Sequence, residues 1–531
     1  MNSKPVPPTN ATSPNLVFPS APRGRDTRWL WIILAAQWLL SAGFLANKTL
    51  WLDEAYSALM ARLPLKDIIP AMAFDAGPPL YYMLLRMWRA VLGESETALR
   101  GLSLLAALAA SVGIYQLTRE AIGRQAALLA TLLFAFSPLT MAYAREARQY
   151  TLLAALAVGV AWYARRYVTR GGFPYLAGTG LGWLALVYTH NLGWFIVLGS
   201  GLAVLALPGG KQRFPALLAC GALVLILYLP WLPMLAAQWQ NTERTIAWVE
   251  KAWTPWMLGY TWTGFLPGGA LPAYMDLPRF PVWGQIANSL IVGGALLWGV
   301  YQAIRINQRF IFFVLILLFV GLGGPYLVSL AGKPIYLAGR TDYGLFPFWC
   351  LLAGYGISHV RWKQAPVIFL LLFLPQAAGI DTAYQLREDP RSERDLVLYL
   401  DKHAQTGDGI LCTGLTRPVL EYYLRNRGFV FFSYPLDMKN HLAHLNESWY
   451  LAYVNLHAEA ETVLRTAQQT LRPGNRLWVV GSERVLNQPL LARIERSNGA
   501  NRIQSPRMGL RKLNEPLFLL QVDYAALVPL R

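Results

Sequence analysis

The sequence is poor in charged residues and in cysteine. Only 14% of its 531 residues are Asp, Glu, Lys or Arg, against about 25% in an average soluble domain. With 55% hydrophobic residues, the chain is neither disordered nor an ordinary soluble enzyme. Its three cysteines, Cys220, Cys350 and Cys412, form no CxxC pair, and two of them lie in apolar runs. We therefore expect neither a disulfide framework nor a zinc site.

What the sequence does contain is a series of long apolar runs. A helix needs about 20 apolar residues to cross a bilayer core. Eleven runs are close to this length and, apart from their edges, contain no acidic or basic residue; they are 30–47, 101–118, 126–144, 149–164, 174–188, 192–208, 214–235, 283–303, 310–331, 343–358 and 364–380. The sequence thus predicts a polytopic α-helical membrane protein with about eleven transmembrane helices.

The net charge of +18 can arise from nucleic-acid binding or from the positive-inside rule. With the N-terminus in the cytoplasm, the inner segments hold 15 Lys and Arg and two acids, and the outer loops hold 13 Lys and Arg and eleven acids. The bias follows the positive-inside rule, so no nucleic-acid partner is expected. A shorter segment, 78–93, carries Arg86 and Arg89 and is predicted to lie on the membrane surface as an amphipathic helix, because counting it as a span would reverse the bias.

This topology divides the chain into three regions. Residues 1–29 are predicted to be a disordered cytoplasmic tail, and residues 30–380 a transmembrane domain with a long first outer loop, 48–100. Residues 381–531 contain no run long enough to span, and their alternating helix and strand patterns predict a soluble, extra-cytoplasmic α/β domain. That region has no Gly-rich phosphate loop and no catalytic triad pattern.

The acidic residues of the outer loops are few and clustered. The first outer loop opens with WLDEAYS, which places Asp53 and Glu54 just after the first span. Adjacent residues face different directions on a helix, so only one of the pair is expected to point into a shared site. The alternative is a helix N-terminus that carries acids because the macrodipole favours them.

Two basic clusters accompany these acids on the outer side. AREARQY contains Arg145 and Arg148, which would share one face of a helix, and GKPIYLAGRTDYG contains Lys333, Arg340 and Asp342. The positive-inside rule gives outer arginines no topological purpose. They are predicted to bind an anionic substrate, and the alternative is contact with lipid head groups.

A carboxylate with several guanidinium groups at the membrane surface suits sugar transfer from a lipid phosphate. The leaving phosphate is already stable as an anion, and arginines can hold its charge through paired hydrogen bonds. The acceptor hydroxyl is a weak nucleophile and needs a carboxylate to take its proton. A polyprenyl tail could lie in an apolar groove between helices.

Four segments, WLDEAYS, FDAGPPLYYMLL, GESETALRGLS and FAFSPLTMAYAREARQYTLL, resemble the core of the type C glycosyltransferase superfamily (GT-C). The resemblance covers roughly residues 28–390. It is nearest to the bacterial branch similar to protein O-mannosyltransferases and lipid A aminoarabinose transferase. It implies a GT-C type fold and a membrane glycosyltransferase.

The resemblance also implies roles for individual residues. Asp53 would be the catalytic base, with Glu54 beside it, and Arg148 and Tyr150 would lie near the substrate. Arg100 matches the arginine that opens the second span in this superfamily. Arg340 matches a basic residue of a late outer loop near the lipid phosphate. The superfamily often has His before the paired prolines, where this sequence has Gly77.

The sequence therefore predicts an inverting glycosyltransferase on the outer face of the inner membrane. It would use a polyprenyl-phosphate sugar as donor and a hydroxyl of a cell-envelope glycan, lipid or protein as acceptor, and nothing indicates a cofactor or a metal ion. An O-antigen ligase or polymerase, a lipid-linked sugar transporter and a receptor or scaffold are the alternatives. A transporter would place ionisable residues inside its spans, and those are absent from the runs.

Overall fold

The computed structural model describes most of the chain. The described residues are 27–43, 45–46, 49–75, 77–241, 247–266, 282–360, 394–437, 446–482, 484–496, 500–502, 511–512 and 515–523. The predicted N-terminal tail, the eleventh apolar run at 364–380 and the domain boundary near residue 380 lie wholly or largely outside these residues.

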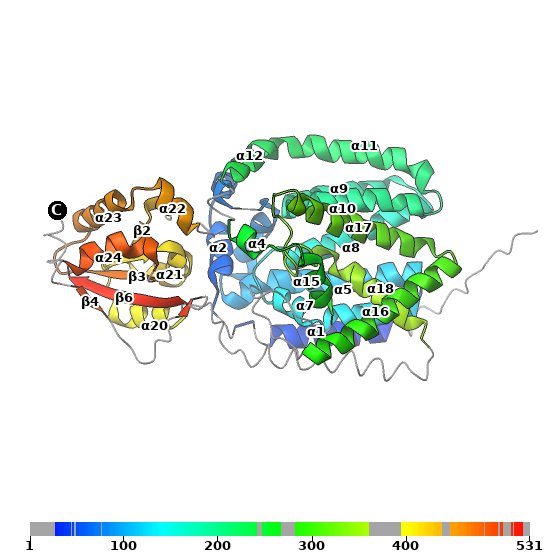
Figure 1. Ribbon diagram of the computed structural model, residues 1–531, viewed down its shortest axis with the longest axis horizontal. Helices are drawn as coiled ribbons and strands as arrows, with labels where there is room; N and C mark the ends of the chain where they lie inside the picture. The colour runs from blue at the N-terminus through cyan, green and yellow to red at the C-terminus, as the bar shows by residue number, and fades with distance from the viewer. Residues whose placement is uncertain are drawn as a thin grey trace, which may run out of the picture.

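The larger part of the structure is a bundle of helices (Figure 1). Its long helices are α1 (Thr27–Ala42), α5 (Glu96–Ala121), α6 (Arg124–Ala135), α8 (Tyr150–Arg170), α9 (Phe173–Thr189), α10 (Gly193–Ala203), α11 (Gly210–Tyr228), α16 (Val282–Arg305), α17 (Arg309–Leu330) and α18 (Phe346–Ser358). The shorter helices are α2 (Leu52–Met60), α3 (Leu65–Ala71), α4 (Leu80–Leu92), α7 (Pro138–Ala144), α12 (Leu232–Gln240), α14 (Ala247–Ala252) and α15 (Met257–Phe265). Every predicted apolar run within the described residues overlaps a helix, but the run 126–144 is divided between α6 and α7, which are bent by 61°, and the run 214–235 extends from α11 into α12.

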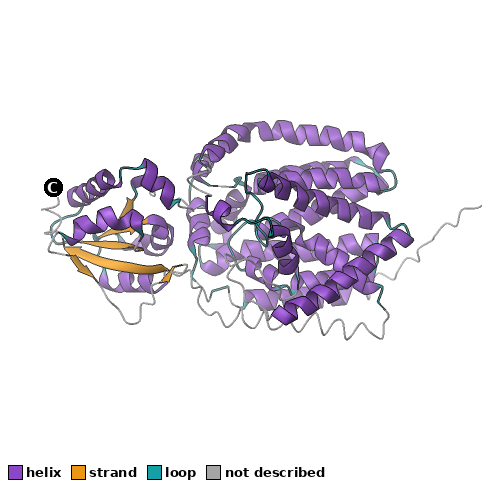
Figure 2. Ribbon diagram, viewed as in Figure 1, coloured by secondary structure: helices purple, strands orange, loops and turns teal. Residues whose placement is uncertain are grey.

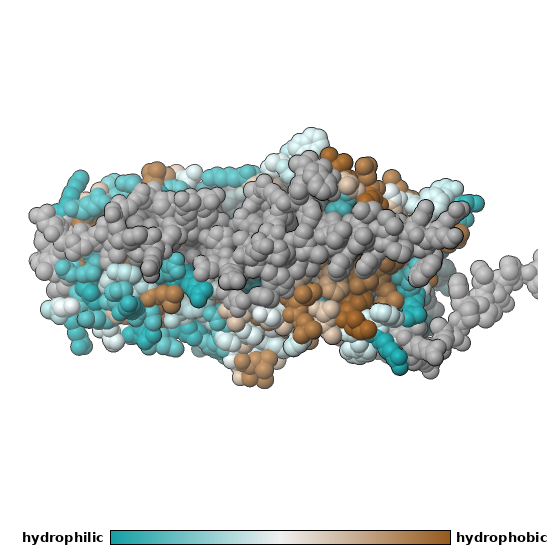
Figure 3. Space-filling model, turned by 90° about the horizontal axis from the view of Figure 1, so that it is seen from below, coloured by the Kyte–Doolittle hydropathy of each residue, from teal (hydrophilic) through white to brown (hydrophobic). Residues whose placement is uncertain are grey.

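Four of the described helices are long and apolar enough to cross a membrane, and a fifth span results if the bent pair α6 and α7 is counted as one. The chain is thus a helical membrane protein, and the number eleven stays a prediction. Outward-facing residues agree with a lipid environment, since Leu218, Leu225 and Ile226 of α11 are all more than half exposed. Figure 3 shows hydrophobic surface gathered over the helical part and hydrophilic surface over the opposite end.

Small residues bring the helices close together. A Cβ atom at Gly354 of α18 would lie 2.6 Å from the backbone nitrogen of Ala130 in α6. A Cβ atom at Gly356 would lie 1.9 Å from the carbonyl oxygen of Ala295 in α16. Glycine permits such contact because it has no side chain, and close backbone packing is how membrane helices associate without a hydrophobic driving force.

The C-terminal part is a sheet flanked by helices, and in Figure 2 the strands are confined to this end of the molecule. The strands are β1 (Gly409–Thr413), β2 (Val430–Tyr434), β3 (Arg476–Ser482), β4 (Ala500–Arg502), β5 (Arg511–Lys512) and β6 (Glu515–Asp523). The helices are α20 (Arg394–His403), α21 (Arg417–Leu424), α22 (Glu447–Tyr453), α23 (Leu456–Thr470) and α24 (Gln488–Glu495). The strand order is β2-β1-β3-β6-β4, and β5 pairs with β6.

The strand pattern of the sequence explains how this sheet is covered. β1 is parallel to β2 and to β3, whereas β6 is antiparallel to β3. Successive side chains of a strand point to opposite faces. Accordingly Ile410 and Cys412 belong to one buried cluster with α20 and α21, and Leu411 belongs to another with α23 and α24. Both faces are covered, which accounts for the continuous apolar run of β1.

Candidate active site

Asp53 lies in the first turn of α2 and is almost fully buried. Its Oδ2 atom accepts a hydrogen bond of 2.7 Å from Nη2 of Arg340 and lies 3.9 Å from Nη2 of Arg148. Arg340 also donates from Nε to the hydroxyl of Tyr150 at 2.6 Å, and its guanidinium lies over the ring of Trp248. These side chains come from four parts of the chain that are far apart in sequence: α2, the start of α8, α14 and the segment before α18. Folding brings them together.

Arg148 is held from several sides. Its Nη1 donates to the hydroxyl of Tyr82 at 3.2 Å, and its backbone oxygen accepts from the hydroxyl of Ser103 at 3.0 Å. The Tyr82 hydroxyl in turn donates to Asp75 at 2.7 Å. The Nε atom of Arg148 is buried and has no hydrogen-bond partner among the described residues. Such a buried charged donor is costly, so a bound anion would stabilise it.

Glu54 points away from Asp53, as adjacent helical residues must. It forms two hydrogen bonds of 2.7 Å with Arg100, which also donates to the backbone oxygens of Leu45 and Thr49. Glu54 accepts a further bond of 2.9 Å from the backbone N–H of Ala147. This buried pair ties α2 to α5 and to the turn that carries Arg148.

The expectation that Arg145 and Arg148 share one helical face is wrong. Helix α7 ends at Ala144 and α8 begins at Tyr150, so the two arginines lie in the turn between them. The turn is stabilised because Glu54 accepts the N–H of Ala147, so this N–H needs no helical partner. Arg145 instead bonds back to the carbonyl oxygen of Met141 at 3.2 Å.

A cavity of about 370 Å³ opens beside the two arginines. Its lining combines cations, acids, amides and aromatic rings: Asp75, Gly77, Arg148, Gln149, Tyr150, His190, Asn191, Leu192, Trp194, Phe195, Tyr228, Leu235, Gln238, Trp239, Trp248, Val249, Glu250, Lys333, Pro334, Ile335, Leu337, Arg340 and Thr341. Its size and its mixture of apolar walls with a few polar groups are typical of a small-ligand site.

The residues predicted from the sequence fall into two groups. Arg148, Tyr150, Lys333 and Arg340 line the cavity, and Asp53 lies behind Arg340. The other three, Glu54, Arg100 and Arg145, are not among the lining residues.

Asp75, His190 and Trp248 are three of the lining residues that were not selected from the sequence. Asp75 lies at the start of the FDAGPPLYY segment, and Trp248 belongs to the Trp-rich loop 236–282. The Trp248 signal was not specific, because aromatic residues also form interfacial belts.

His190 is an uncharged hydrogen-bonding group in this cavity. Burial, with smaller contributions from the charges of Arg148 and Arg340, lowers the pKa of His190 to about 4. Its Nδ1 accepts the backbone N–H of Leu192 at 3.1 Å. A neutral ring that accepts at Nδ1 carries its proton on Nε2, so the second nitrogen is an N–H donor.

Asp342 fixes the loop that bears Arg340. Its Oδ2 accepts hydrogen bonds from Thr261 at 2.5 Å and from Tyr336 at 3.4 Å. Burial raises the pKa of Asp342 to about 7, although these hydrogen bonds oppose the shift.

This shift predicts a pH-dependent stability. The pKa of an unfolded Asp is about 3.9, so between about pH 4 and pH 7 the folded state retains a proton that the unfolded chain releases. The free energy of unfolding should therefore fall as the pH rises through this window. Asp342→Asn should weaken the fall, measured as thermal unfolding midpoints in detergent at pH 5 and pH 8. An equal fall in both proteins would contradict the assignment.

Among the described residues, no group of three or more His, Cys, Asp and Glu side chains is arranged to hold a metal ion. The site is instead rich in guanidinium groups.

Comparison with known proteins indicates the class of enzyme. The sequence model of the family described as "Dolichyl-phosphate-mannose-protein mannosyltransferase" matches residues 76–233. The structure is similar to ArnT from Cupriavidus metallidurans in the apo state, with a TM-score of 0.63 at 12% identity, covering 94% of this chain and 99% of that one. These matches indicate a glycosyltransferase whose fold is similar to that of the GT-C superfamily.

Other solved structures share this GT-C fold. ArnT bound to undecaprenyl phosphate gives a TM-score of 0.57 at 13% identity and covers 93% of this chain and 98% of that one. The oligosaccharyltransferase of Archaeoglobus fulgidus tethered with an acceptor peptide gives 0.52 at 12% identity, covering 86% and 69%. No curated protein matches by sequence. The family match spans α4 to α11 and so includes Arg148 and Tyr150, whereas Asp53 and Arg340 lie outside it.

Proposed function

We propose that this GT-C enzyme transfers a sugar from a polyprenyl-phosphate donor to a hydroxyl acceptor with inversion at the anomeric carbon. The arrangement of Asp53, Arg340 and Arg148 beside the cavity carries the proposal, because it joins a carboxylate to two phosphate-binding cations. The likeness to ArnT bound to undecaprenyl phosphate supports the choice of a polyprenyl donor.

In this mechanism the arginines hold the phosphate. The buried Nε–H of Arg148 has no partner in the described part of the chain, and Arg340 faces both the cavity and Asp53. A phosphate that enters the cavity competes with Asp53 for Arg340. The guanidinium groups then stabilise the charge that remains on the lipid phosphate as the sugar leaves.

Asp53 acts as the general base. In the structure its carboxylate is paired with Arg340. When the phosphate draws Arg340 toward the cavity, the carboxylate loses part of this pairing and becomes free to accept the proton of the acceptor hydroxyl. Attack from the side opposite the phosphate inverts the configuration, so no covalent sugar–enzyme intermediate is required.

The site belongs to the outer face of the inner membrane in this proposal, and the C-terminal domain is extra-cytoplasmic. The charge distribution of the sequence supports this orientation, because the loops that carry Asp53, Arg148 and Arg340 all lie on the side with fewer excess cations. The acceptor is then a cell-envelope glycan, lipid or protein.

The proposal is tested by mixing purified protein in detergent with undecaprenyl-phosphate sugars and a cell-envelope extract. Formation of free undecaprenyl phosphate, followed by mass spectrometry, should require both the protein and the extract. Failure of every such donor to release undecaprenyl phosphate would contradict the proposed donor class.

Replacement of the cavity arginines should weaken use of the donor. Arg340→Ala and Arg148→Ala each remove a charge-assisted contact of about 1.5–3 kcal/mol, so the donor KM should rise or kcat should fall about ten- to hundred-fold. Lysine should restore activity only in part, because it cannot form the paired hydrogen bonds of arginine. Steady-state kinetics with varied donor concentration measure both effects.

Arg145→Ala is the matched control, since Arg145 lies in the same turn but outside the cavity lining. It should leave donor kinetics nearly unchanged. Normal donor kinetics in both Arg148→Ala and Arg340→Ala would place the phosphate elsewhere.

A further inference from the structure

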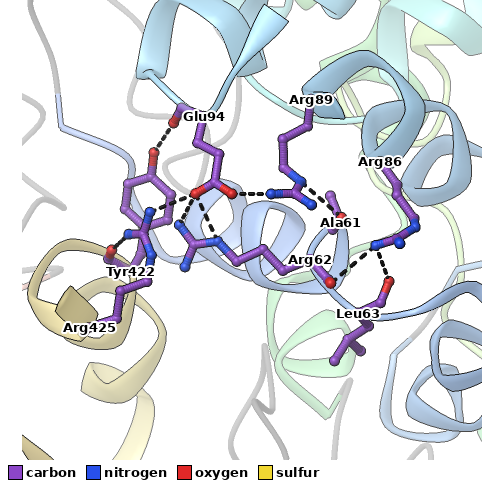
Figure 4. Close-up of polar contacts among 8 residues, drawn as sticks. All are labelled: Ala61, Arg62, Leu63, Arg86, Arg89, Glu94, Tyr422 and Arg425. Atoms are coloured by element: carbon purple, nitrogen blue, oxygen red, sulfur yellow. Dashed lines mark hydrogen bonds and ion pairs between the residues drawn. The ribbon is translucent and has the colours of Figure 1, made fainter. Parts of the chain in front are cut away.

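Helix α2 is held at its C-terminal end by two arginines of α4. Arg86 donates from Nη1 to the backbone oxygens of Arg62 at 3.1 Å and Leu63 at 2.6 Å, and Arg89 donates from Nε to that of Ala61 at 3.2 Å (Figure 4). The last carbonyl groups of a helix lack partners within it, and cations are favourable there. These arginines therefore fix the end of the helix that bears the proposed base.

The N-terminal end of α2 is held by the C-terminal domain. The backbone N–H of Leu50, a fully buried residue, donates to the hydroxyl of Tyr423 at 2.8 Å. The same hydroxyl donates its proton to Glu96 at 2.9 Å. Tyr423 lies on α21, which follows the first strand of the C-terminal sheet, and α21 packs against α2. One side chain thus joins the C-terminal domain to the segment that leads into the site.

A second group of contacts, centred on Glu94, holds α21 against α2 and α4. Glu94 forms ion pairs with Arg62 of the α2 end, Arg89 of α4 and Arg425 of the C-terminal domain (Figure 4). The hydroxyl of Tyr422 donates to the backbone oxygen of Glu94. These groups are half-buried, so each ion pair is worth little by itself. Together they cross-link three elements at the domain junction.

We propose that Tyr423 is a positioning residue for the transfer reaction. It fixes the backbone at Leu50, and this sets the place of Asp53, one turn further along, relative to Arg340. The C-terminal domain is thereby a part of the active-site scaffold. This inference rests on the proposed role of Asp53 as the base.

Tyr423 should affect turnover because the reaction tolerates little displacement of the catalytic base. Loss of the Tyr423 hydroxyl leaves the buried N–H of Leu50 without its acceptor, and a buried donor in that state shifts toward a new partner. A misplacement of about 1 Å can lower turnover about hundred-fold. The donor-binding groups, Arg148 and Arg340, lie on other elements. Both also bond to groups outside α2, Arg340 to Tyr150 and Arg148 to Tyr82, and we expect these bonds to keep them in the cavity.

The test compares Tyr423→Phe with Tyr422→Phe in the purified full-length protein. Both changes remove one hydroxyl from α21 and keep the ring, but only Tyr423 contacts the entry to α2. Tyr423→Phe should lower kcat for undecaprenyl phosphate release about ten- to hundred-fold per folded molecule, with the donor KM unchanged. Tyr422→Phe should retain wild-type kcat, because the Arg425–Glu94 ion pair still holds the end of α21. Glu96→Ala, which removes the acceptor that orients the Tyr423 hydroxyl, should show the same split between kcat and KM.

Each outcome decides the inference. Wild-type kcat in Tyr423→Phe, or a lower yield of folded protein with normal kcat, would overturn it. An equal loss of kcat in Tyr422→Phe would show that any change at the domain junction lowers turnover, and it would also overturn the inference. Asp53→Asn serves as the reference: if that variant is active, the proposed function fails, whereas an inactive Asp53→Asn with a fully active Tyr423→Phe rejects only the role of Tyr423.

Discussion

Asp53→Asn is expected to lower turnover about a hundred- to ten-thousand-fold, the usual contribution of general-base catalysis. Asparagine has nearly the same shape as aspartate but cannot accept the acceptor's proton. Arg340 keeps its bond to Tyr150 and Arg148 its bond to Tyr82, so the folded variant should still bind undecaprenyl phosphate. Turnover and lipid binding measured on the same preparation separate these two effects.

Asp75→Asn is the comparison that makes this result specific. Asp75 is a further buried acid near Arg148, and it lines the cavity directly. Its Oδ2 atom already accepts the hydroxyl of Tyr82, so we expect it to position that tyrosine and Arg148. If Asp75→Asn abolished turnover while Asp53→Asn retained it, the base would have been assigned to the wrong carboxylate.

Glu54→Gln is expected to destabilise the protein more than it impairs chemistry. The pair with Arg100 is buried, with side-chain exposures of 3% and 1%. Removing one charge of a buried pair leaves the other unpaired and costs about 3–5 kcal/mol. The thermal unfolding midpoint should therefore fall strongly, whereas turnover per folded molecule should fall much less than in Asp53→Asn.

Glu120→Gln is the matched control for Glu54→Gln. Glu120 pairs with Arg165 and Arg166 at the far end of α5, where its side chain is 25% exposed. A pair of this kind contributes about 0–1 kcal/mol, so the unfolding midpoint should barely change. A Glu54→Gln variant that folds normally but has no turnover would show that Glu54 takes part in the reaction.

Much of the helical architecture could be predicted because the bilayer imposes a simple rule on the sequence. Each apolar run of suitable length must form a helix, since no water is present to bind its backbone. Strands β1, β2, β3 and β6 were also predictable from their apolar runs. The short strands β4 and β5 were not, because their pairing with β6 depends on contacts between distant segments.

The candidate site was predictable in its residue types but not in its geometry. Asp53, Arg148, Tyr150 and Arg340 could be selected because charges on the outer side are few. Their grouping depends on a turn at 145–149 whose N–H of Ala147 binds Glu54, and local periodicity cannot predict a bond between residues so far apart in sequence. Likewise, the sequence predicts that Arg86 and Arg89 lie at the membrane surface. It could not predict that both donate hydrogen bonds to backbone oxygens just after the end of α2.

A cryo-electron microscopy map of the purified protein with undecaprenyl phosphate tests the central claim most directly. We expect phosphate density in the cavity, within hydrogen-bonding distance of both Arg148 and Arg340, with the Arg340–Asp53 bond of 2.7 Å lengthened or broken. Phosphate density outside this cavity, with the Arg340–Asp53 pair unchanged, would contradict it.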